Sequence, residues 1–368
     1  MLYIYWLIFS VAVWIYSYGF VDLNLTLSSH PLVFHFISYL QHLVYFDRSL
    51  SLQIFIGLIL VAFGLYLYTL KTVTSFPWRL VVTVSIILAL AYPMLSSDVF
   101  KYLFSAKEIL VYHANPYLVT PNAFPDDTWI RFMRWVHTTT PYGPLFTGLT
   151  IPYYLLGMGK FVPILYLFKI DQVAWYLLAI WLIGKLKGVK AQIFFAFNPL
   201  ILIEWLVNAH NDALMITLLL LSLYLLTLKR KIWSYVALLA SVGIKYITII
   251  FVPVLLFPKL LKNHFQSTIC WLIALLTLAP LLYHYSWQYQ PWYVTWIIPF
   301  AGLVDSKLIK WTVATYSFSV ISRYLYFVGT GSWLGTPLEH LLMTFLPPVI
   351  VAIMILCNGF LSSKKSSG

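Results

Sequence analysis

The chain has 368 residues, of which 61% are hydrophobic and only 9% are charged. A water-soluble domain of this length does not need so much apolar surface, so the composition excludes a soluble enzyme and indicates a protein in lipid. The net charge of +12 comes from Lys and Arg residues scattered between long apolar runs, which is typical of membrane-protein loops and not of a nucleic-acid-binding surface. Cys270 and Cys357 both lie inside apolar segments, so we expect no disulfide framework and no Cys-rich metal site.

Apolar runs follow one another along the chain, and each is a candidate membrane helix. They lie at about residues 2–20, 50–70, 79–95, 161–184, 191–207, 212–228, 232–257, 266–284, 291–304, 309–328 and 338–360. No small-residue cleavage site follows Phe20, so we expect an uncleaved first span. The run 232–257 is either one long span or two short helices that meet near Lys245.

The positive-inside rule chooses between these two interpretations. With two short helices and a cytoplasmic N-terminus, most of the 23 Lys and Arg residues fall inside, whereas one long span moves most of them outside. We therefore predict the pair, about twelve spans, and both termini in the cytoplasm. A helix of about 13 residues covers roughly 20 Å of a hydrocarbon layer roughly 30 Å thick, so the break near Lys245 should lie in protein or beside water. All Asp and Glu residues except Asp305 then fall on the outer side or in the outer half.

Residues 96–142 form the one long hydrophilic stretch, which this topology places outside. Loops of such length are usually functional or disordered, and the aromatic content argues against disorder. A Ser at the N-cap and Asp98 in the first turn predict a helix start. Asp98, Lys101 and Tyr102 share one helix face, so we expect an amphipathic helix along the outer surface. Asp98 either complements the helix dipole or acts as a general base.

Two turn-forming segments follow, Asn115-Pro116-Tyr117 and Pro141-Tyr142-Gly143-Pro144, with Trp129 and Trp135 between them. Aromatic side chains near polar groups suit stacking on sugar rings. An aromatic belt at the membrane interface is the alternative interpretation.

Polar residues also cluster in a short outer connection between two spans, Asn208-Ala209-His210-Asn211-Asp212, with Glu204 about one turn earlier. Such residues are costly among Leu-rich helices unless they are solvated or used. The alternative is a hydrated hairpin in which Asp212 caps the next helix. A metal on His210 and Asp212 is disfavoured, because the sequence has no HExxH motif and no dense His/Asp cluster.

Lys245 and Arg323 are cations within apolar runs. Each either extends its charge to the interface or meets an anionic phosphate. Trp292 and Tyr293 begin a span at the outer face, where they are either interface anchors or part of a site.

Taken together, these segments resemble the polyprenol-phosphate-mannose-dependent α-mannosyltransferases of the GT-C superfamily. The resemblance runs in order over most of the chain and is carried by Ser97-Asp98-Val99-Phe100-Lys101-Tyr102, Asn115-Pro116-Tyr117, Tyr142-Gly143-Pro144-Leu145, Asn198-Pro199-Leu200, Asn208-Ala209-His210-Asn211-Asp212, Lys245-Tyr246 and Pro291-Trp292-Tyr293-Val294-Thr295-Trp296. Two departures stand out. Many GT-C enzymes have two adjacent acids in the first large outer loop, whereas Asp98 stands alone, which weakens the case for a metal. That loop also follows the third apolar run here instead of the first.

The resemblance implies an all-α integral membrane protein, a GT-C-like bundle of about twelve helices whose outer loop carries amphipathic helices. It implies an inverting transfer of a hexose from a polyprenyl phosphate to an acceptor on the outer face, and mannose is the hexose that we expect. Asp98 matches the catalytic base. Lys245 and Arg323 would offset the charge that develops on the phosphate. The substrate- or donor-binding set is Lys101, Tyr102, Asn115, Tyr117, Tyr142, Glu204, Asn208, His210, Asn211, Asp212, Lys245, Trp292, Tyr293 and Arg323.

We expect one polytopic domain over residues 1–368, made of N-terminal helices (1–95), an outer catalytic loop with interfacial helices (96–160) and the remaining bundle (161–360). The expected partners are the lipid-linked sugar donor, a glycolipid, glycan or protein acceptor, and membrane lipid, with no nucleic acid, cofactor or metal. The expected location is the plasma membrane, with the site on the extracytoplasmic face. A flippase or transporter of a lipid-linked sugar is the alternative, although the sequence lacks the two similar halves common among transporters.

Overall fold

The computed structural model describes residues 1–257, 259–282, 289–333 and 337–365, and within these ranges the chain is helical and has no strand. The α-helices are α1 (Leu2–Tyr18), α2 (Pro31–Gln41), α3 (Arg48–Thr72), α4 (Trp78–Ala89), α5 (Asp98–Leu110), α6 (Pro144–Leu156), α7 (Phe161–Lys187), α8 (Val189–Ala196), α9 (Pro199–Ile201), α10 (Asp212–Thr227), α11 (Lys231–Ile244), α12 (Val252–Leu256), α13 (Lys259–Leu278), α14 (Pro291–Thr295), α15 (Ile298–Leu303), α16 (Lys307–Ser319), α17 (Ser322–Thr330) and α18 (Pro337–Lys365). Two π-helices, His42–Phe46 and Leu202–Val207, and several short 3-10 turns join them.

Four helical segments in the described ranges are long and apolar enough to cross a membrane: Arg48–Thr72, Phe161–Lys187, Lys262–Leu282 and Leu338–Asn358. A fifth candidate is the bent pair Val189–Ala196 and Pro199–Val207, whose two parts meet at 55°. Five further apolar helices are shorter than these. The all-helical architecture with apolar spans is thus confirmed, whereas the count of about twelve spans stays a prediction.

The helix break at Lys245 is present. α11 ends at Ile244, Lys245 has an extended backbone (φ −152°, ψ 124°), and a 3-10 turn resumes at Tyr246. The carbonyl of Ile244, which the break leaves outside the helix ladder, accepts a hydrogen bond from the Gly143 N–H at 2.9 Å. A Cβ on Gly143 would lie 2.1 Å from the Gly243 carbonyl oxygen. Two backbones therefore touch at this point, which glycine alone permits.

α5 begins at Asp98 as predicted, with Ser97 at the N-cap. The expectation that α5 lies along an exposed surface is wrong. Residues on both of its faces are buried, including Val99 and Leu103 on the apolar side and Lys101 and Tyr102 on the polar side. The polar face is covered because the following segment and α6 fold back over it: Tyr102 packs edge-on against Tyr142 at 4.7 Å and Phe146 at 4.8 Å.

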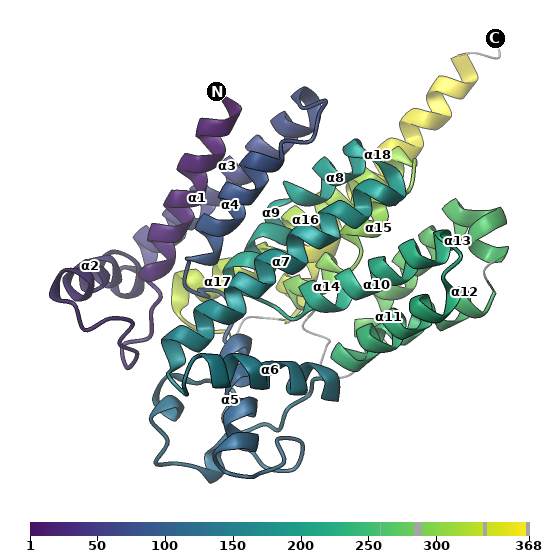
Figure 1. Cartoon of the computed structure of the whole chain (residues 1–368). Coiled ribbons are helices and arrows are strands. Elements are labelled where there is room, and N and C mark those ends of the chain that lie inside the picture. The colour runs from purple at the N-terminus through teal and green to yellow at the C-terminus, as the bar shows by residue number, and fades with distance from the viewer. Residues whose placement is uncertain (258, 283–288, 334–336, 366–368) are drawn as a thin grey trace.

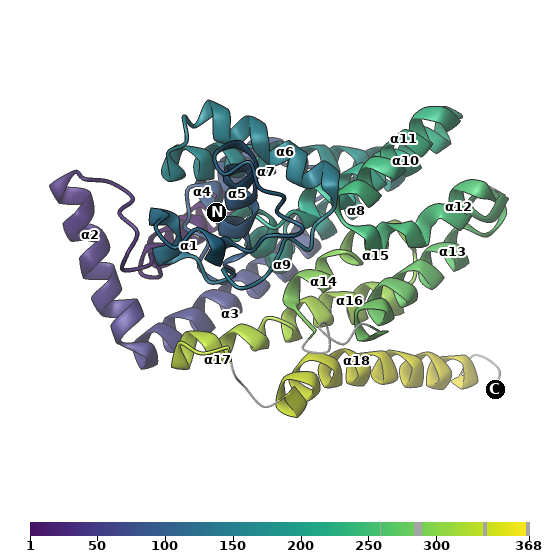
Figure 2. The ribbon, with the colours of Figure 1, turned by 90° about the horizontal axis from the view of Figure 1, so that it is seen from below.

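α5 and α6 lie together at one end of the molecule, and both chain termini lie at the other (Figure 1). Seen from the α5 end, α3 and α17 run along the same edge (Figure 2). α3 starts at Arg48 and carries Lys71 in its last turn. At 1.5 Å per residue, the roughly 23 residues between them separate these two charges by about 35 Å, so each lies near a different end of the bundle.

Candidate active site

The segment Asn208–Asn211 joins the π-helix Leu202–Val207 to α10. Ala209 adopts a left-handed backbone with φ +56°, which is strained for a residue with a Cβ. The His210 N–H donates to the Glu204 carbonyl at 2.9 Å, which holds the turn closed. A π-helix that leads into a strained turn is a frequent mark of functional sites. Here it directs the side chains of Glu204, Asn208 and His210 toward the start of α5.

His210 is fully buried and lies at the centre of a polar cluster. Its Nδ1 is 3.7 Å from Oδ2 of Asp98 and 3.4 Å from the Tyr102 hydroxyl, and its Nε2 is 3.2 Å from Oε2 of Glu204. The ring stacks on Trp292 with 4.5 Å between centroids. Burial lowers the pKa of His210 below its ordinary value of 6.5, against the opposing effect of the Asp98 and Asp212 carboxylates. A neutral ring can donate through one nitrogen and accept through the other.

Hydrogen bonds tie this cluster to the surrounding helices. Glu204 accepts from the Tyr324 hydroxyl at 2.7 Å and from Asn208 Nδ2 at 3.2 Å. Asn208 Oδ1 in turn accepts from the Leu95 N–H at 3.1 Å. Because Leu95 lies three residues before Asp98, this bond links the turn that carries His210 to the segment that carries Asp98.

Asp212 is held by two donors. Lys245 Nζ lies 2.9 and 3.0 Å from its two carboxylate oxygens, and Trp296 Nε1 also donates to it. Lys245 therefore compensates the buried charge of Asp212, as buried carboxylates require. The Tyr102 hydroxyl donates to Asn211 Oδ1 at 3.5 Å, so Asn211 belongs to the same cluster.

Asp98 opens onto a cavity of about 340 Å³, in the range of small-molecule sites. The cavity is lined by Leu95, Ser96, Ser97, Asp98, Arg134, Trp135, Gln290, Trp292, Arg323 and Trp333. The Asp98 side chain is 14% exposed, so it is reachable from this space. Arg323 Nε donates to Gln290 Oε1 at 3.4 Å. One carboxylate, two guanidinium groups and three indole rings thus surround one cavity that also borders the His210 cluster through Trp292. Lys245 is not part of this wall.

The other predicted residues have separate partners. Lys101 pairs with Glu108 of the same helix, α5, at 3.4 Å, and both side chains are buried. Asn115 Oδ1 accepts from the Tyr117 N–H at 3.0 Å, and the Tyr117 hydroxyl lies 2.8 Å from Thr147 Oγ1, so these two residues stabilise a turn and its contact with α6. Tyr293 packs against Trp296 at 4.8 Å and Trp292 at 5.7 Å.

Sequence reasoning missed three residues that the geometry brings forward. Lys169 is fully buried, and its Nζ donates to the carbonyls of Ala91 and Val207, each at 2.6 Å. It thereby ties together the chain segments that lead to Asp98 and to His210. A lysine in the middle of an apolar run was the available signal. Arg134 and Tyr324 carried no comparable signal, because an arginine in a long loop and a tyrosine in an apolar helix are common.

Comparison with known families settles the class of protein. Residues 9–259 match the family described as Alpha-(1->6)-mannopyranosyltransferase, N-terminal domain, the MptA_B family. The chain belongs to this family. No curated protein and no solved structure matches it. This mannosyltransferase is therefore a hexosyltransferase, and the resemblance to polyprenol-phosphate-mannose-dependent enzymes of the GT-C type is confirmed. The matched range includes Asp98, His210 and Lys245, whereas Trp292 and Arg323 lie beyond it.

Within the described part of the chain, no group of three or more His, Cys, Asp or Glu side chains is arranged to hold a metal ion.

Proposed function

We propose that the mannosyltransferase moves mannose, with inversion at the anomeric carbon, from a polyprenyl phosphate to an acceptor hydroxyl in the Asp98 cavity. The observation that carries this proposal is the shared wall: Asp98 and Arg323 both line one cavity large enough for a small-molecule substrate. A base and a phosphate-binding cation are the two groups that such a displacement needs.

In the proposed reaction, Asp98 accepts the proton of the acceptor hydroxyl while its oxygen attacks the anomeric carbon. The bond from that carbon to the phosphate oxygen breaks, and its electron pair leaves on the polyprenyl phosphate. Arg323 stabilises the negative charge that develops there, and a guanidinium group suits phosphate because its fork of N–H donors matches two oxygens. Trp292 offers an aromatic surface to the sugar ring.

His210 and its neighbours act as positioning residues in this proposal. The ring lies behind Asp98, between Tyr102 and Glu204, and none of these three lines the cavity. A buried network of this kind fixes the orientation of a general base and lowers its freedom to rotate away. Lys245 contributes by neutralising Asp212, so that Asp98 does not face a second unpaired carboxylate.

The proposed location is the plasma membrane, with one multi-pass domain over residues 1–368, the cavity on the extracytoplasmic face and both termini inside. The distribution of lysines supports this orientation. A second cavity of about 480 Å³ is lined by Lys71, Lys190, Lys307 and Lys310 together with apolar residues. Lys71 belongs to the end of α3 away from Arg48, and cationic side chains gather on cytoplasmic faces. The proposed acceptor is a glycolipid, glycan or protein.

Transfer by purified protein tests the proposal. Polyprenyl phosphate mannose with a radiolabelled sugar is incubated with the protein in detergent together with candidate mannoside acceptors. We expect label to move to an acceptor and polyprenyl phosphate to be released, and the new anomeric centre to be α when the donor is β. Retained configuration, or no transfer from any polyprenyl phosphate sugar, contradicts the proposal. A flippase gives no product in this assay, because it moves a lipid-linked sugar without forming or breaking a glycosidic bond.

A further inference from the structure

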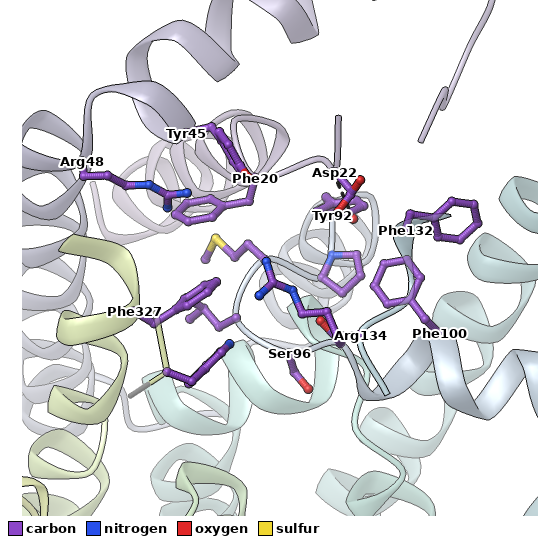
Figure 3. Close-up of a pocket in the computed structure, with 15 residues that line it drawn as sticks. Phe20, Asp22, Tyr45, Arg48, Tyr92, Ser96, Phe100, Phe132, Arg134 and Phe327 are labelled. Carbon is purple, nitrogen blue, oxygen red and sulfur yellow. Dashed lines mark hydrogen bonds between the residues drawn. The ribbon is translucent and has the colours of Figure 1, made fainter. Parts of the chain in front are cut away.

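A second, smaller recess adjoins the Asp98 cavity. Its volume is about 40 Å³, and its walls include Asp22, Tyr45, Arg48, Tyr92, Arg134 and Phe327 (Figure 3). Leu95, Ser96, Ser97, Arg134 and Trp333 line both spaces. The recess and the Asp98 cavity therefore adjoin, and the Ser96-Ser97 segment forms part of the wall of each.

Two arginines direct their guanidinium groups into this recess from different elements (Figure 3). Arg48 starts α3, and Arg134 belongs to the segment between α5 and α6. Arg48 lies 4.5 Å from the centroid of the Tyr45 ring, and Arg134 lies 5.7 Å from that of Phe327.

Neither arginine has a carboxylate partner. Among the described residues no ion pair includes Arg48 or Arg134. Arg48 Nη1 is fully buried and has no hydrogen-bond partner. Asp22 lies in the same wall, but it forms no ion pair with either arginine, and its Oδ1 accepts from the N–H and the Nδ2 of Asn24. A buried cationic donor without an acceptor is costly, so such a group is usually completed by an anion.

The size of the recess restricts what that anion is. A water molecule needs about 10–15 Å³, so a recess of about 40 Å³ accepts a few atoms and no sugar ring. Two guanidinium groups match the oxygens of a phosphate better than any neutral group does. The ligand that fits is therefore a compact anionic group, and the adjoining Asp98 cavity has room for the group that carries it.

We propose that Arg48 and Arg134 form a second anion site, distinct from Arg323, which binds a phosphate group of a substrate whose sugar occupies the Asp98 cavity. This inference rests on the proposed function for the nature of that sugar. The donor carries one phosphate, which the proposed function gives to Arg323, so the phosphate at Arg48 and Arg134 belongs to an anionic acceptor such as a glycolipid. Loss of these arginines should therefore affect the acceptor and not the donor.

Binding of inorganic phosphate to the purified full-length protein tests the site without catalysis. Arg48 lines the recess and not the larger cavity, so Arg48→Gln isolates the second site. We expect Arg48→Gln and Arg134→Gln to reduce phosphate affinity at least tenfold. The matched control is Arg131→Gln, an exposed arginine three residues from Arg134 that lines neither space, and it should stay within twofold of wild type. Unchanged phosphate affinity in Arg48→Gln overturns the site.

Arg134→Glu separates ligand binding from a structural role. It gives Arg48 a counter-charge within the recess, so we expect the melting temperature without phosphate to equal or exceed that of wild type while phosphate no longer raises it. A lower melting temperature together with an intact phosphate effect overturns the proposal. If Arg48→Gln fails to fold, Arg48→Lys keeps the charge without the guanidinium fork and should show the same loss of affinity.

Transfer kinetics then identify the source of the phosphate. Two acceptors with the same mannoside are compared, one with a neutral alkyl group and one with a phosphate ester. A KM increase of tenfold or more in Arg48→Gln for the phosphate-bearing acceptor alone supports the site, whereas the same increase in the donor KM shows that the donor phosphate binds there and contradicts the role proposed for Arg323. If Arg48→Gln has the same KM values as wild type for the donor and for both acceptors, the site is overturned. A protein that binds phosphate through Arg48 but transfers no mannose contradicts the proposed function and leaves the anion site standing.

Discussion

Asp98 is the residue on which the proposed chemistry depends, and Asp98→Asn tests it most directly. The amide is nearly isosteric, so folding should be close to normal, but it cannot accept the proton of the acceptor. We expect less than a tenth of the wild-type turnover, which corresponds to a barrier increase of more than about 1.4 kcal/mol. Asp126→Asn, at an exposed position of the same segment, is the matched control. Turnover above a tenth of wild type in Asp98→Asn rejects the base assignment.

Glu108 gives a prediction about pH and stability. Burial raises the pKa of Glu108 from 4.5 to about 6, against the opposing charge of Lys101. The folded protein therefore binds a proton more tightly than the unfolded chain between these two values. The contribution of Glu108 to stability is largest at low pH and falls as the pH rises from about 4.5 to about 6.

Unfolding measured as a function of pH checks this sign. The free energy of unfolding of wild type, relative to Glu108→Gln, should decrease as the pH rises from 4.5 to 6.5, because the glutamine does not titrate. A difference that grows with pH over this window would show that pairing with Lys101, and not burial, dominates the environment of Glu108.

The sequence identified most of the polar cluster because its members are costly in lipid and therefore conspicuous. His210, Glu204, Asn208 and Asp212 stand out among Leu-rich helices, and the structure brings them together. Partners are harder to predict than members. The sequence analysis expects Lys245 to bind the donor phosphate, whereas in the structure Lys245 forms an ion pair with Asp212. Which of two buried charges meets which anion depends on packing between distant helices, and no local pattern encodes that.

At the scale of elements, the contact between Gly143 and Gly243 holds the segment after α5 against the broken end of α11. A Cβ on Gly143 would meet the Gly243 carbonyl oxygen at 2.1 Å, and a backbone atom cannot move aside as a side chain can. We expect Gly143→Ala to lower the free energy of unfolding by about 1–3 kcal/mol, as overpacking does, and to reduce transfer because Tyr142 supports Tyr102.

Gly148→Ala is the matched control for Gly143→Ala. Gly148 lies within α6, and a Cβ there meets no atom within 4 Å. Alanine favours the helix over glycine by about 1 kcal/mol, so this variant should be as stable as wild type or more so. Chemical unfolding of both variants in the same detergent measures the difference. Equal stability of the two variants means that the Gly143 contact is not needed.

The helix break at Lys245 was predictable, whereas the burial of α5 was not. The break followed from charge: only two short helices leave most cations on one side. The polar face of α5 looked solvent-exposed because Asp98, Lys101 and Tyr102 share it. The structure covers this face with Tyr142, and on the face itself Lys101 pairs with Glu108 of the same helix, where both side chains are buried. A polar helix face beside a long loop has the same sequence pattern whether water or protein covers it.

At the scale of the whole molecule, α3 joins two chemically different ends. Arg48 at its start lines the recess beside the Asp98 cavity, and Lys71 in its last turn lines the cavity with four lysines. Apolar runs in the sequence located this helix well, since its length alone permits a span. Shorter apolar helices such as α10 and α11 are not long enough for length alone to identify them as membrane spans. Their relation to the membrane depends on how they pack in the bundle.

The orientation proposed for the protein places these two ends on opposite sides of the membrane, and cysteine labelling can measure this. Asn122 belongs to the segment after α5. Arg230 follows the end of α10 that lies away from Asp212. Asn122 and Arg230 are both exposed. In a background where Cys270 and Cys357 are replaced by serine, Asn122→Cys should react with a membrane-impermeant maleimide in intact cells. Arg230→Cys should react only after the membrane is opened, because lysines and arginines gather on the cytoplasmic side. Labelling of both positions in intact cells would place the lysine cavity and the Asp98 cavity on the same face, and the extracytoplasmic assignment of the mannosyltransferase site would then be wrong.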